Sequence, residues 1–233
     1  MAIERLVLAF GIGCALANAS GGLDRARVEV RKTEQIEFQA DGTVVFKNSI
    51  GELRVDAWDQ PNVEITTIKS TKAGYDPAQH DRAARELDKV RVSAERRGGE
   101  LTITTDFPRG LFGTNFDLEY DIKVPRKTRL KVDHRGGEVH ADGILGDLQI
   151  AAARGEITVH LPEKGSYAID AKSDFGAVFS DFPGRAKRMA WLVGQKMNES
   201  AANGSGNLHL RIGYGDILIL RERVPAPLAA AAP

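Results

Sequence analysis

The sequence predicts a mainly β protein: a single-domain, right-handed β-solenoid or β-roll with short glycine-turn rungs and one short helix in its N-terminal half. Three observations support this prediction. Apolar and polar residues alternate with a period of two along most of the chain. A phrase of glycine, acid and β-forming residues recurs, as in Gly155-Glu156-Ile157. Three of its glycines, Gly137, Gly146 and Gly155, are nine residues apart, and a constant spacing of turns is typical of stacked β-rungs.

The N-terminus has the pattern of an export signal. Arg5 precedes an apolar run over residues 6–17, and Ala19 and Ser20 flank a cleavage site of the small-x-small type. The apolar run is too short to span a bilayer. Residues 1–19 therefore predict a signal peptide that is removed on export, which leaves no transmembrane segment in the mature chain.

The other end segments predict no packed structure. Cys14, the only cysteine, lies inside the signal peptide and lacks the leucine that usually stands three positions before a lipidated cysteine. This argues against a lipoprotein, and a mature chain without a thiol excludes disulfides and cysteine catalysis. Residues 20–27 are expected to form a flexible N-terminus. Residues 222–233, rich in alanine and proline, are expected to form a disordered tail.

The β domain is predicted over residues 28–221. In its first part, alternating segments are bounded by turn residues, so each segment places one face on a core and the other in water. These segments cover residues 28–30, 34–38, 42–47, 53–55, 63–68, 90–92, 101–105 and 116–124.

One helix is predicted between these strands. Asp76 supplies an N-cap residue, and Pro77 occupies the first helical position. The following residues, 78–90, are rich in helix formers and place a narrow apolar stripe on one face. The stripe consists of Ala83, Ala84, Leu87 and Val90. A stripe this narrow predicts a short helix on the side or end of the sheet.

From residue 128 onward, the predicted strands shorten to three to five residues separated by glycine turns. They cover residues 130–132, 139–141, 148–150, 157–159, 167–169, 177–179, 208–210 and 217–219. The acid after each phrase glycine is predicted to point outward and to keep the exposed surface polar. These acids are Glu52, Glu138, Asp147, Glu156 and Asp216. The alternative is a carboxylate ladder that binds cations or substrate.

The strand and turn patterns carry a resemblance to a known family. They are concentrated in residues 45–59, 63–69, 120–125, 137–159 and 206–217. On these segments the chain resembles an adhesin family of exported bacterial β-repeat proteins, a domain of unknown function of the β-solenoid or β-roll type. The likeness extends over about residues 28–221. It implies an exported envelope or surface protein, and it brings no catalytic residues to transfer.

The charge and the histidines argue against nucleic acid, metal ions and cofactors. Lys plus Arg and Asp plus Glu both number 32, so no net field favours nucleic acid as a partner. Stacked rungs would allow His140 and His160 to approach each other, but no metal-binding motif requires it. We therefore expect surface histidines, no metal site and no cofactor. The remaining histidines are His80, His134 and His209.

An enzyme hypothesis comes from architecture, since β-helices also form polysaccharide lyases and glycoside hydrolases. Candidate acids and bases are Asp170, Lys172, Asp174 and Asp181, flanked by Phe175, Phe179 and Phe182. The favoured alternative is that Phe175 and Phe179 fill the core while the acids stand outside.

Two loops, over residues 106–116 and 185–203, interrupt the repeat with apolar residues. They either cap an open end of the sheet or contact a partner, and capping is slightly favoured. The predicted contact residues are Phe107, Arg109, Phe112, Phe116 and Trp191.

The sequence thus predicts an exported, non-catalytic module of the periplasm or cell surface that acts by contact with an unknown envelope protein or glycan. The alternatives are a β-helix carbohydrate-active enzyme and a periplasmic component of an envelope stress or signalling system.

Overall fold

The computed structural model describes residues 25–108, 116–163, 165–189, 194–200 and 206–222. The predicted signal peptide, with Cys14 and the cleavage site between Ala19 and Ser20, lies outside the described residues, as does the predicted tail from residue 223 onward. Within the described ranges, no helix is both long enough and apolar enough to cross a bilayer.

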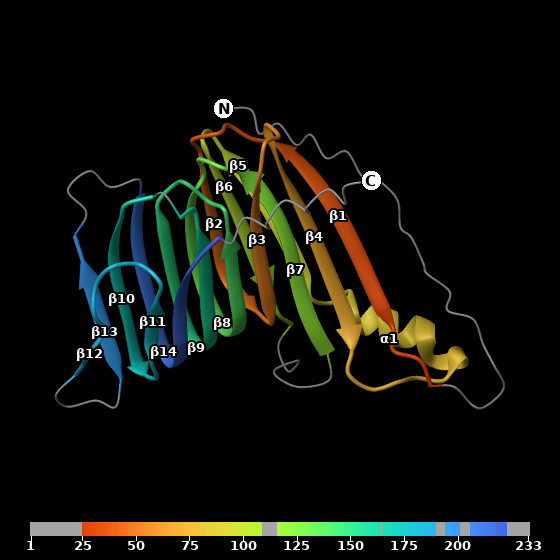
Figure 1. Ribbon diagram of the computed structural model, residues 1–233. Coiled ribbons are helices and arrows are strands. Elements are labelled where there is room, and N and C mark those ends of the chain that lie inside the picture. Colours follow the sequence, from red (N-terminus) through yellow and green to blue (C-terminus); the bar gives the residue numbers. More distant parts are fainter. Residues whose placement is uncertain (1–24, 109–115, 164, 190–193, 201–205, 223–233) are drawn as a thin grey trace, which may run out of the picture.

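The described strands hydrogen-bond into one sheet of fourteen strands (Figure 1). They are β1 (Glu29–Glu37), β2 (Thr43–Ile50), β3 (Glu52–Trp58), β4 (Asn62–Thr71), β5 (Arg91–Arg97), β6 (Glu100–Asp106), β7 (Phe116–Pro125), β8 (Arg129–Asp142), β9 (Leu148–Leu161), β10 (Tyr167–Phe175), β11 (Val178–Ser180), β12 (Lys187–Arg188), β13 (Gln195–Glu199) and β14 (Gly206–Arg221). The main path is β1-β4-β7-β3-β8-β9-β14-β10-β13-β12. Its two ends lie far apart in Figure 1, so the sheet does not close.

The long strands β8, β9 and β14 belong to two arms of the sheet. The first half of β8 pairs with β2, and its second half pairs with β3. The first arm continues through β6 and β5, whereas the second continues through β7, β4 and β1. The Thr105 Oγ1 of β6 lies 2.7 Å from the Tyr120 hydroxyl of β7, and these two strands do not pair. The hydrogen bond therefore crosses between the arms, and the core lies in the space that they enclose.

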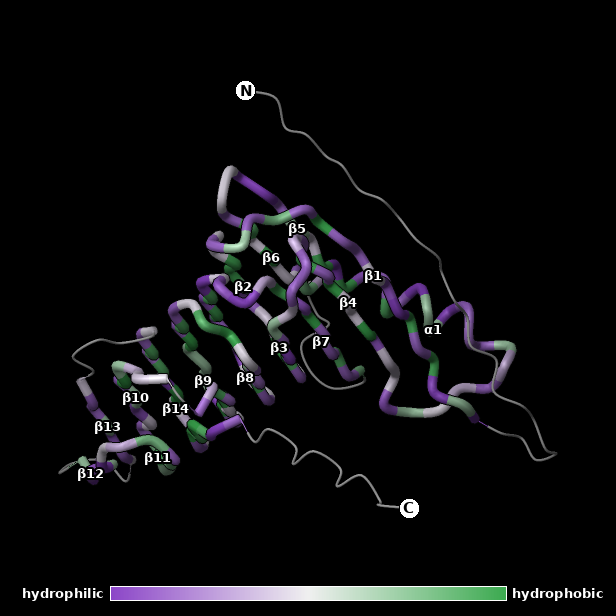
Figure 2. The backbone as a smooth tube through the Cα atoms, turned by 45° about the horizontal axis from the view of Figure 1, so that its top comes forward, coloured by the Kyte–Doolittle hydropathy of each residue, from purple (hydrophilic) through white to green (hydrophobic). Residues whose placement is uncertain are grey.

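Alternating residues of both arms fill this core. Along β8 and β10 every second residue is buried for most of the strand, as the sequence periodicity predicts. Figure 2 shows this alternation as green and purple bands along the strands. Phe46 of the first arm and Val55 of the second belong to one continuous cluster of buried apolar residues. The prediction of a mainly β protein with one short helix is confirmed.

A column of glycines lies where the strands pass from one arm to the other. Gly137, Gly155 and Gly215 are paired in register on β8, β9 and β14, and their φ angles are +117°, +124° and +130°. A Cβ atom on Gly155 would lie 1.7 Å from the carbonyl oxygen of Gly137. Gly51 and Gly176 extend this glycine column on either side. Both the backbone angle and the interstrand approach exclude a side chain here.

The glycines bend strands rather than end them, which corrects the predicted short strands. Strands β8 and β9 run on through Gly137 and Gly155, and these two residues pair directly. Gly146 lies in the connection between the two strands, so the nine-residue spacing alternates between a bend and a turn. Strand β14 then lies between β9 and β10, so neighbouring strands are not consecutive in sequence. This order and the open ends do not establish the predicted solenoid or roll.

The helix lies beside β1 and β4 at one end of the sheet (Figure 1). A 3-10 turn, η1 (Pro77–Gln79), leads into α1 (His80–Leu87), and the Asp76 side chain makes no capping hydrogen bond. Ala83 and Leu87 are buried against Val28. Val90 follows the helix and belongs to the main core. The predicted stripe is therefore the packed face, although the helix itself is shorter than predicted.

A buried lysine joins this helix to the sheet. The Lys69 side chain of β4 is nearly buried, and its Nζ donates to the carbonyl oxygens of Leu87 (3.4 Å) and Val90 (3.0 Å) and to Asp88 Oδ1 (3.4 Å). Leu87 ends α1 and Val90 follows it, at the end of the helix where carbonyl groups lack intrahelical partners. The ammonium group therefore adds a donor to the Leu87 carbonyl oxygen, which also accepts from the backbone N of Val90, and donates to the Val90 carbonyl oxygen.

Replacing Lys69 with methionine is expected to lower the free energy of unfolding by about 2 kcal/mol, because the carbonyl oxygens of Leu87 and Val90 would lose the charged ammonium as a donor. Urea denaturation of the two proteins measures the change. Lys89→Met, which removes only an exposed ion pair with Glu86, is the matched control and should change stability by less than about 0.5 kcal/mol. Equal stability of Lys69→Met and the parent protein would contradict the prediction.

Candidate functional site

A cavity of about 620 Å³ opens at the bend of the sheet, and we call it the bend pocket. Two residues of the glycine column, Gly51 and Gly137, are among its lining residues. The strands β2, β3, β7, β8 and β9 contribute its walls. Because glycine has no side chain, the bend leaves room for a cavity where other residues would fill it.

One wall of the bend pocket is aromatic. Phe107 follows β6 and Phe116 begins β7, and their ring centroids are 6.5 Å apart with an interplanar angle of 25°. Both rings are partly buried and pack against the main core. They are fixed in place by the core below and still present a surface to the pocket.

The remaining walls carry charges of both signs. The acids are Glu52, Asp117 and Glu119, and the bases are Lys72, Arg135 and Arg154. The Lys72 Nζ lies 3.6 Å from Asp117 Oδ1. The Arg154 side chain lies across Gly136, because a Cβ atom on that glycine would be 2.9 Å from Arg154 Nε. The pocket therefore combines an apolar surface with donors and acceptors and has no excess of either charge.

A row of carboxylates runs along the second arm directly after the glycine column. Glu138, Glu156 and Asp216 are register partners on β8, β9 and β14, and Glu52 and Glu119 are partners on β3 and β7. Leu53 pairs with Val139, so Glu52 also neighbours Glu138. We call these five residues the acidic row.

Four of the five acids that follow a phrase glycine belong to the acidic row. Asp147 is not a member, because it precedes β9 and its Oδ1 accepts hydrogen bonds from the backbone N and the Nδ2 of Asn207. Glu156 accepts a hydrogen bond from Thr158, and Asp216 accepts one from the backbone N of Ala177. Local donors thus offset part of the repulsion between neighbouring carboxylates.

Two of the five predicted contact residues line the bend pocket, namely Phe107 and Phe116. The other three, Arg109, Phe112 and Trp191, lie outside the described residues. The sequence analysis did not single out Lys72, Glu119 or Arg154. Lys72 and Arg154 lie close to a glycine in the sequence, whereas Glu119 lies within a strand and gave no signal. The pairing of distant strands brings all three to one pocket.

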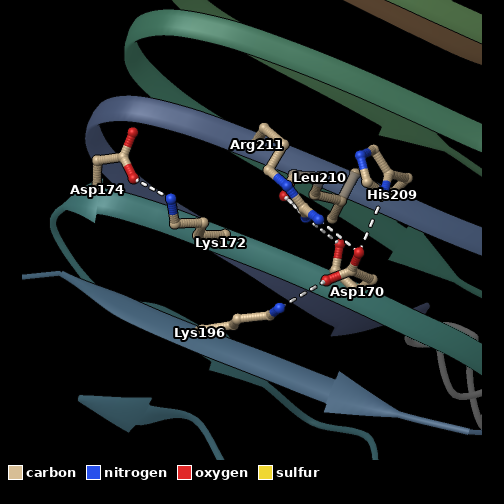
Figure 3. Close-up of polar contacts among 7 residues, drawn as sticks. All are labelled: Asp170, Lys172, Asp174, Lys196, His209, Leu210 and Arg211. Atoms are coloured by element: carbon tan, nitrogen blue, oxygen red, sulfur yellow. Dashed lines mark hydrogen bonds and ion pairs between the residues drawn. The ribbon is translucent and has the colours of Figure 1, made fainter. Parts of the chain in front are cut away.

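The acids of the enzyme hypothesis are engaged by neighbouring bases (Figure 3). Asp170 lies beside Arg211, its carbonyl accepts a hydrogen bond of 2.8 Å from Arg211 Nη1, and its Oδ2 is 3.2 Å from His209 Nδ1. Burial alone would raise the pKa of Asp170, but the hydrogen bond and charge of Arg211, followed by the charges of Lys196 and His209, hold the pKa below its ordinary value. These contacts tie β10 to β13 and β14.

The other candidate acids have similar partners. The Lys172 Nζ lies 2.6 Å from Asp174 Oδ1 (Figure 3). Asp181 Oδ2 accepts a hydrogen bond of 3.1 Å from the backbone N of Arg221. Each of the candidate acids is therefore engaged in an ion pair or a hydrogen bond, within β10 for Asp174 and with other segments for Asp170 and Asp181.

The expectation that Phe175 and Phe179 fill the core is wrong. Phe175 is 40% exposed and stacks on Tyr214, which is 62% exposed, with ring centroids 4.6 Å apart and an interplanar angle of 7°. Phe179 is 55% exposed because it alternates with the buried Val178 in β11. Phe182 is buried and packs edge-on against Tyr167 at 5.3 Å.

A carboxyl pair on the second arm was not singled out from the sequence. Asp56 and Asp142 are register partners on β3 and β8, and Asp142 contacts His160 of β9. Burial, and then the neighbouring Asp142 carboxylate, raise the pKa of Asp56. This pair does not line the bend pocket.

The expectation of surface histidines is wrong for His134. His134 is buried, with Nδ1 2.8 Å from Ser49 Oγ, whereas His140 pairs with Glu138 across 3.3 Å. His80 Nε2 donates to the carbonyl oxygen of Tyr75 at 2.9 Å. Among the residues that the structure describes, no three His, Cys, Asp or Glu side chains are arranged so as to hold a metal ion.

The fold is similar to that of known bacterial proteins. A crystal structure of a "putative cell adhesion protein" from Clostridium sporogenes matches with a TM-score of 0.50 and 19% identity over 82% of this chain and 100% of the other. A "putative adhesin" from Bacteroides fragilis matches with a TM-score of 0.30 and 8% identity over 85% of this chain and 99% of the other. No protein-family model and no curated protein sequence matches the chain. The first similarity is a likeness in fold alone, and it does not define an activity.

Proposed function

We propose that this protein is an exported, non-catalytic module of the bacterial cell envelope, located in the periplasm or at the cell surface, that acts by contact with an envelope protein or glycan. The likeness in fold to a protein described by a role in cell adhesion supports this proposal. The N-terminal apolar run with the cleavage pattern at Ala19 and Ser20 supports export.

The bend pocket is the observation that carries the proposal. Two phenylalanine rings, held by the core, lie beside charged groups of both signs in a cavity of about 620 Å³. Contact sites commonly combine a rigid apolar anchor with a polar rim. The ion pairs of Asp170 and Asp174 favour contact over catalysis in the region where the enzyme hypothesis placed its acids.

Replacing Phe107 with alanine is expected to reduce the retention of the purified protein on isolated envelopes of its own host about tenfold, because the aromatic wall of the bend pocket would be lost. Phe179→Ala removes the same side chain from an exposed position outside the pocket and should leave retention unchanged. Thermal denaturation verifies that both variants are folded. A folded Phe107→Ala protein that is retained as well as the parent would refute the proposal.

A further inference from the structure

Three exposed side chains form a strip across neighbouring strands at the bend. Phe175 of β10 pairs with Tyr214 of β14, and Tyr214 pairs with Arg154 of β9. Register partners on adjacent strands are lateral neighbours. The stacking of Phe175 on Tyr214, at 4.6 Å between centroids, confirms this arrangement for the two rings. We call these three residues the bend strip.

The bend strip leads into the bend pocket. Arg154 belongs to both, because its side chain lies across Gly136 and lines the cavity. The path from β10 to β7 crosses β14, β9, β8 and β3 in order. Five steps between strands correspond to roughly 24 Å. The bend therefore presents an elongated surface with stacked rings at one end, a guanidinium group in the middle and a partly aromatic cavity at the other end.

The charges along this surface limit the chemical class of its ligand. The acidic row runs beside the bend strip, with Glu156 and Asp216 two residues after Arg154 and Tyr214 on the same strands. The row would repel the phosphates of a nucleic acid or the carboxylates of an acidic polymer. Carboxylates and guanidinium groups do suit a neutral ligand with many hydroxyl groups, which both donate and accept hydrogen bonds.

The exposed aromatic rings of the bend strip suit the apolar faces of sugar rings. The two faces of a sugar ring present C–H groups that pack on an aromatic face, while the hydroxyl groups project from the ring edge toward polar side chains. Phe175 and Tyr214 are too exposed to be explained by the core. A linear molecule of sugar rings matches both the alternation of apolar and polar groups and the length of the surface.

We propose that the bend strip and the bend pocket together bind a neutral, linear oligosaccharide. Sugar rings stack against Phe175 and Tyr214, Arg154 donates hydrogen bonds to hydroxyl oxygens at the centre, and the acidic row accepts hydrogen bonds from hydroxyl groups. This inference rests on the proposed contact function and names the chemical class of its partner.

Isothermal titration with neutral hexasaccharides tests the proposal. Cellohexaose, chitohexaose and maltohexaose serve as the neutral probes, and hexagalacturonic acid serves as the anionic probe. At least one neutral probe is expected to bind the parent protein, and hexagalacturonic acid is expected to bind more weakly. Tyr214→Ala should weaken binding of that neutral probe about tenfold, Tyr214→Phe should restore it, and Phe179→Ala should change it less than about twofold.

A second variant tests the role of Arg154 without removing its charge. Gly136→Ala adds a methyl group whose near neighbours are atoms of the Arg154 side chain, so the guanidinium must move while the backbone remains. We expect this variant to weaken the same neutral probe about fivefold. Failure of all neutral probes to bind, tighter binding of hexagalacturonic acid, or affinities that Tyr214→Ala and Gly136→Ala leave unchanged would each overturn the proposal.

The outcomes separate this inference from the proposed function. Retention on envelopes that depends on Phe107, combined with no binding of any neutral hexasaccharide, overturns the oligosaccharide assignment and leaves the contact function in place. Binding of a neutral hexasaccharide by a protein whose retention on envelopes does not depend on Phe107 overturns the contact function as proposed.

Discussion

Replacing Gly155 with alanine is expected to lower the free energy of unfolding by more than about 4 kcal/mol, enough to unfold a domain of ordinary stability. Its φ angle of +124° is one that residues with a Cβ atom rarely adopt, and the added Cβ would lie 1.7 Å from the carbonyl oxygen of Gly137. The overlap cannot be relieved by a rotamer change, because the opposing oxygen belongs to the backbone of Gly137. The strands β8 and β9 would have to separate at the bend. Urea denaturation followed by far-UV circular dichroism measures the loss.

Gly98 supplies the matched control for this substitution. Its φ angle of +59° is also positive, but a Cβ atom there would meet no atom within 4 Å. Gly98→Ala therefore tests the backbone angle without the steric overlap, and we expect a loss of only about 1 kcal/mol. If Gly155→Ala lost no more stability than Gly98→Ala, the close approach of the strands in the glycine column would be wrong.

Acidification is expected to destabilise the protein through His134 by about 3 kcal/mol between pH 6.5 and pH 4. The imidazole is 1% exposed, and burial lowers its pKa from 6.5 to about 4. In this interval the unfolded chain binds a proton that the folded protein does not bind. The contribution of neutral, buried His134 to the free energy of unfolding is therefore fully present above pH 6.5 and is lost as the pH falls toward 4.

Comparison with a variant isolates this contribution from that of other groups. His134→Gln is expected to be less stable than the parent at pH 7, because it loses the packing of the ring and the contact with Ser49, but its stability should fall less between pH 6.5 and pH 4. Urea denaturation at several pH values measures the slopes. Parallel slopes for the parent and His134→Gln would contradict the assignment.

Local patterns in the sequence predicted much of the fold. Alternation of apolar and polar residues identified the strands, because the side chains of a strand point to opposite faces in turn. Residues Ala83 and Leu87 marked the packed face of α1 because helical periodicity brings them together. The glycine phrase identified positions where the backbone has a positive φ angle, such as Gly137 and Gly155, although it was interpreted as ending strands rather than bending them.

The candidate site was only partly predictable. Phe107 and Phe116 stood out because apolar residues in a loop are unusual, and both line the bend pocket. Arg154 and Tyr214 did not stand out, because a single charged or aromatic residue near a glycine is common. Phe175 was assigned to the core on the basis of its hydrophobicity, whereas its position beside the bend exposes it.

By itself, the sequence determined most of the strand segments, the apolar face of most of them and where the backbone requires glycine, because these properties depend on residues that are near neighbours in the chain. It did not identify β12 and β13, which lie in the segment predicted as a loop over residues 185–203. The tertiary structure alone decided that β14 lies between β9 and β10 and that the sheet remains open. The pairing of Gly155 with Gly215 and of Arg154 with Tyr214 joins residues far apart in sequence. The recurrent glycines form a column and the recurrent acids form a row because distant strands pair in register. That register depends on packing across the whole core and cannot be read from neighbours in the sequence.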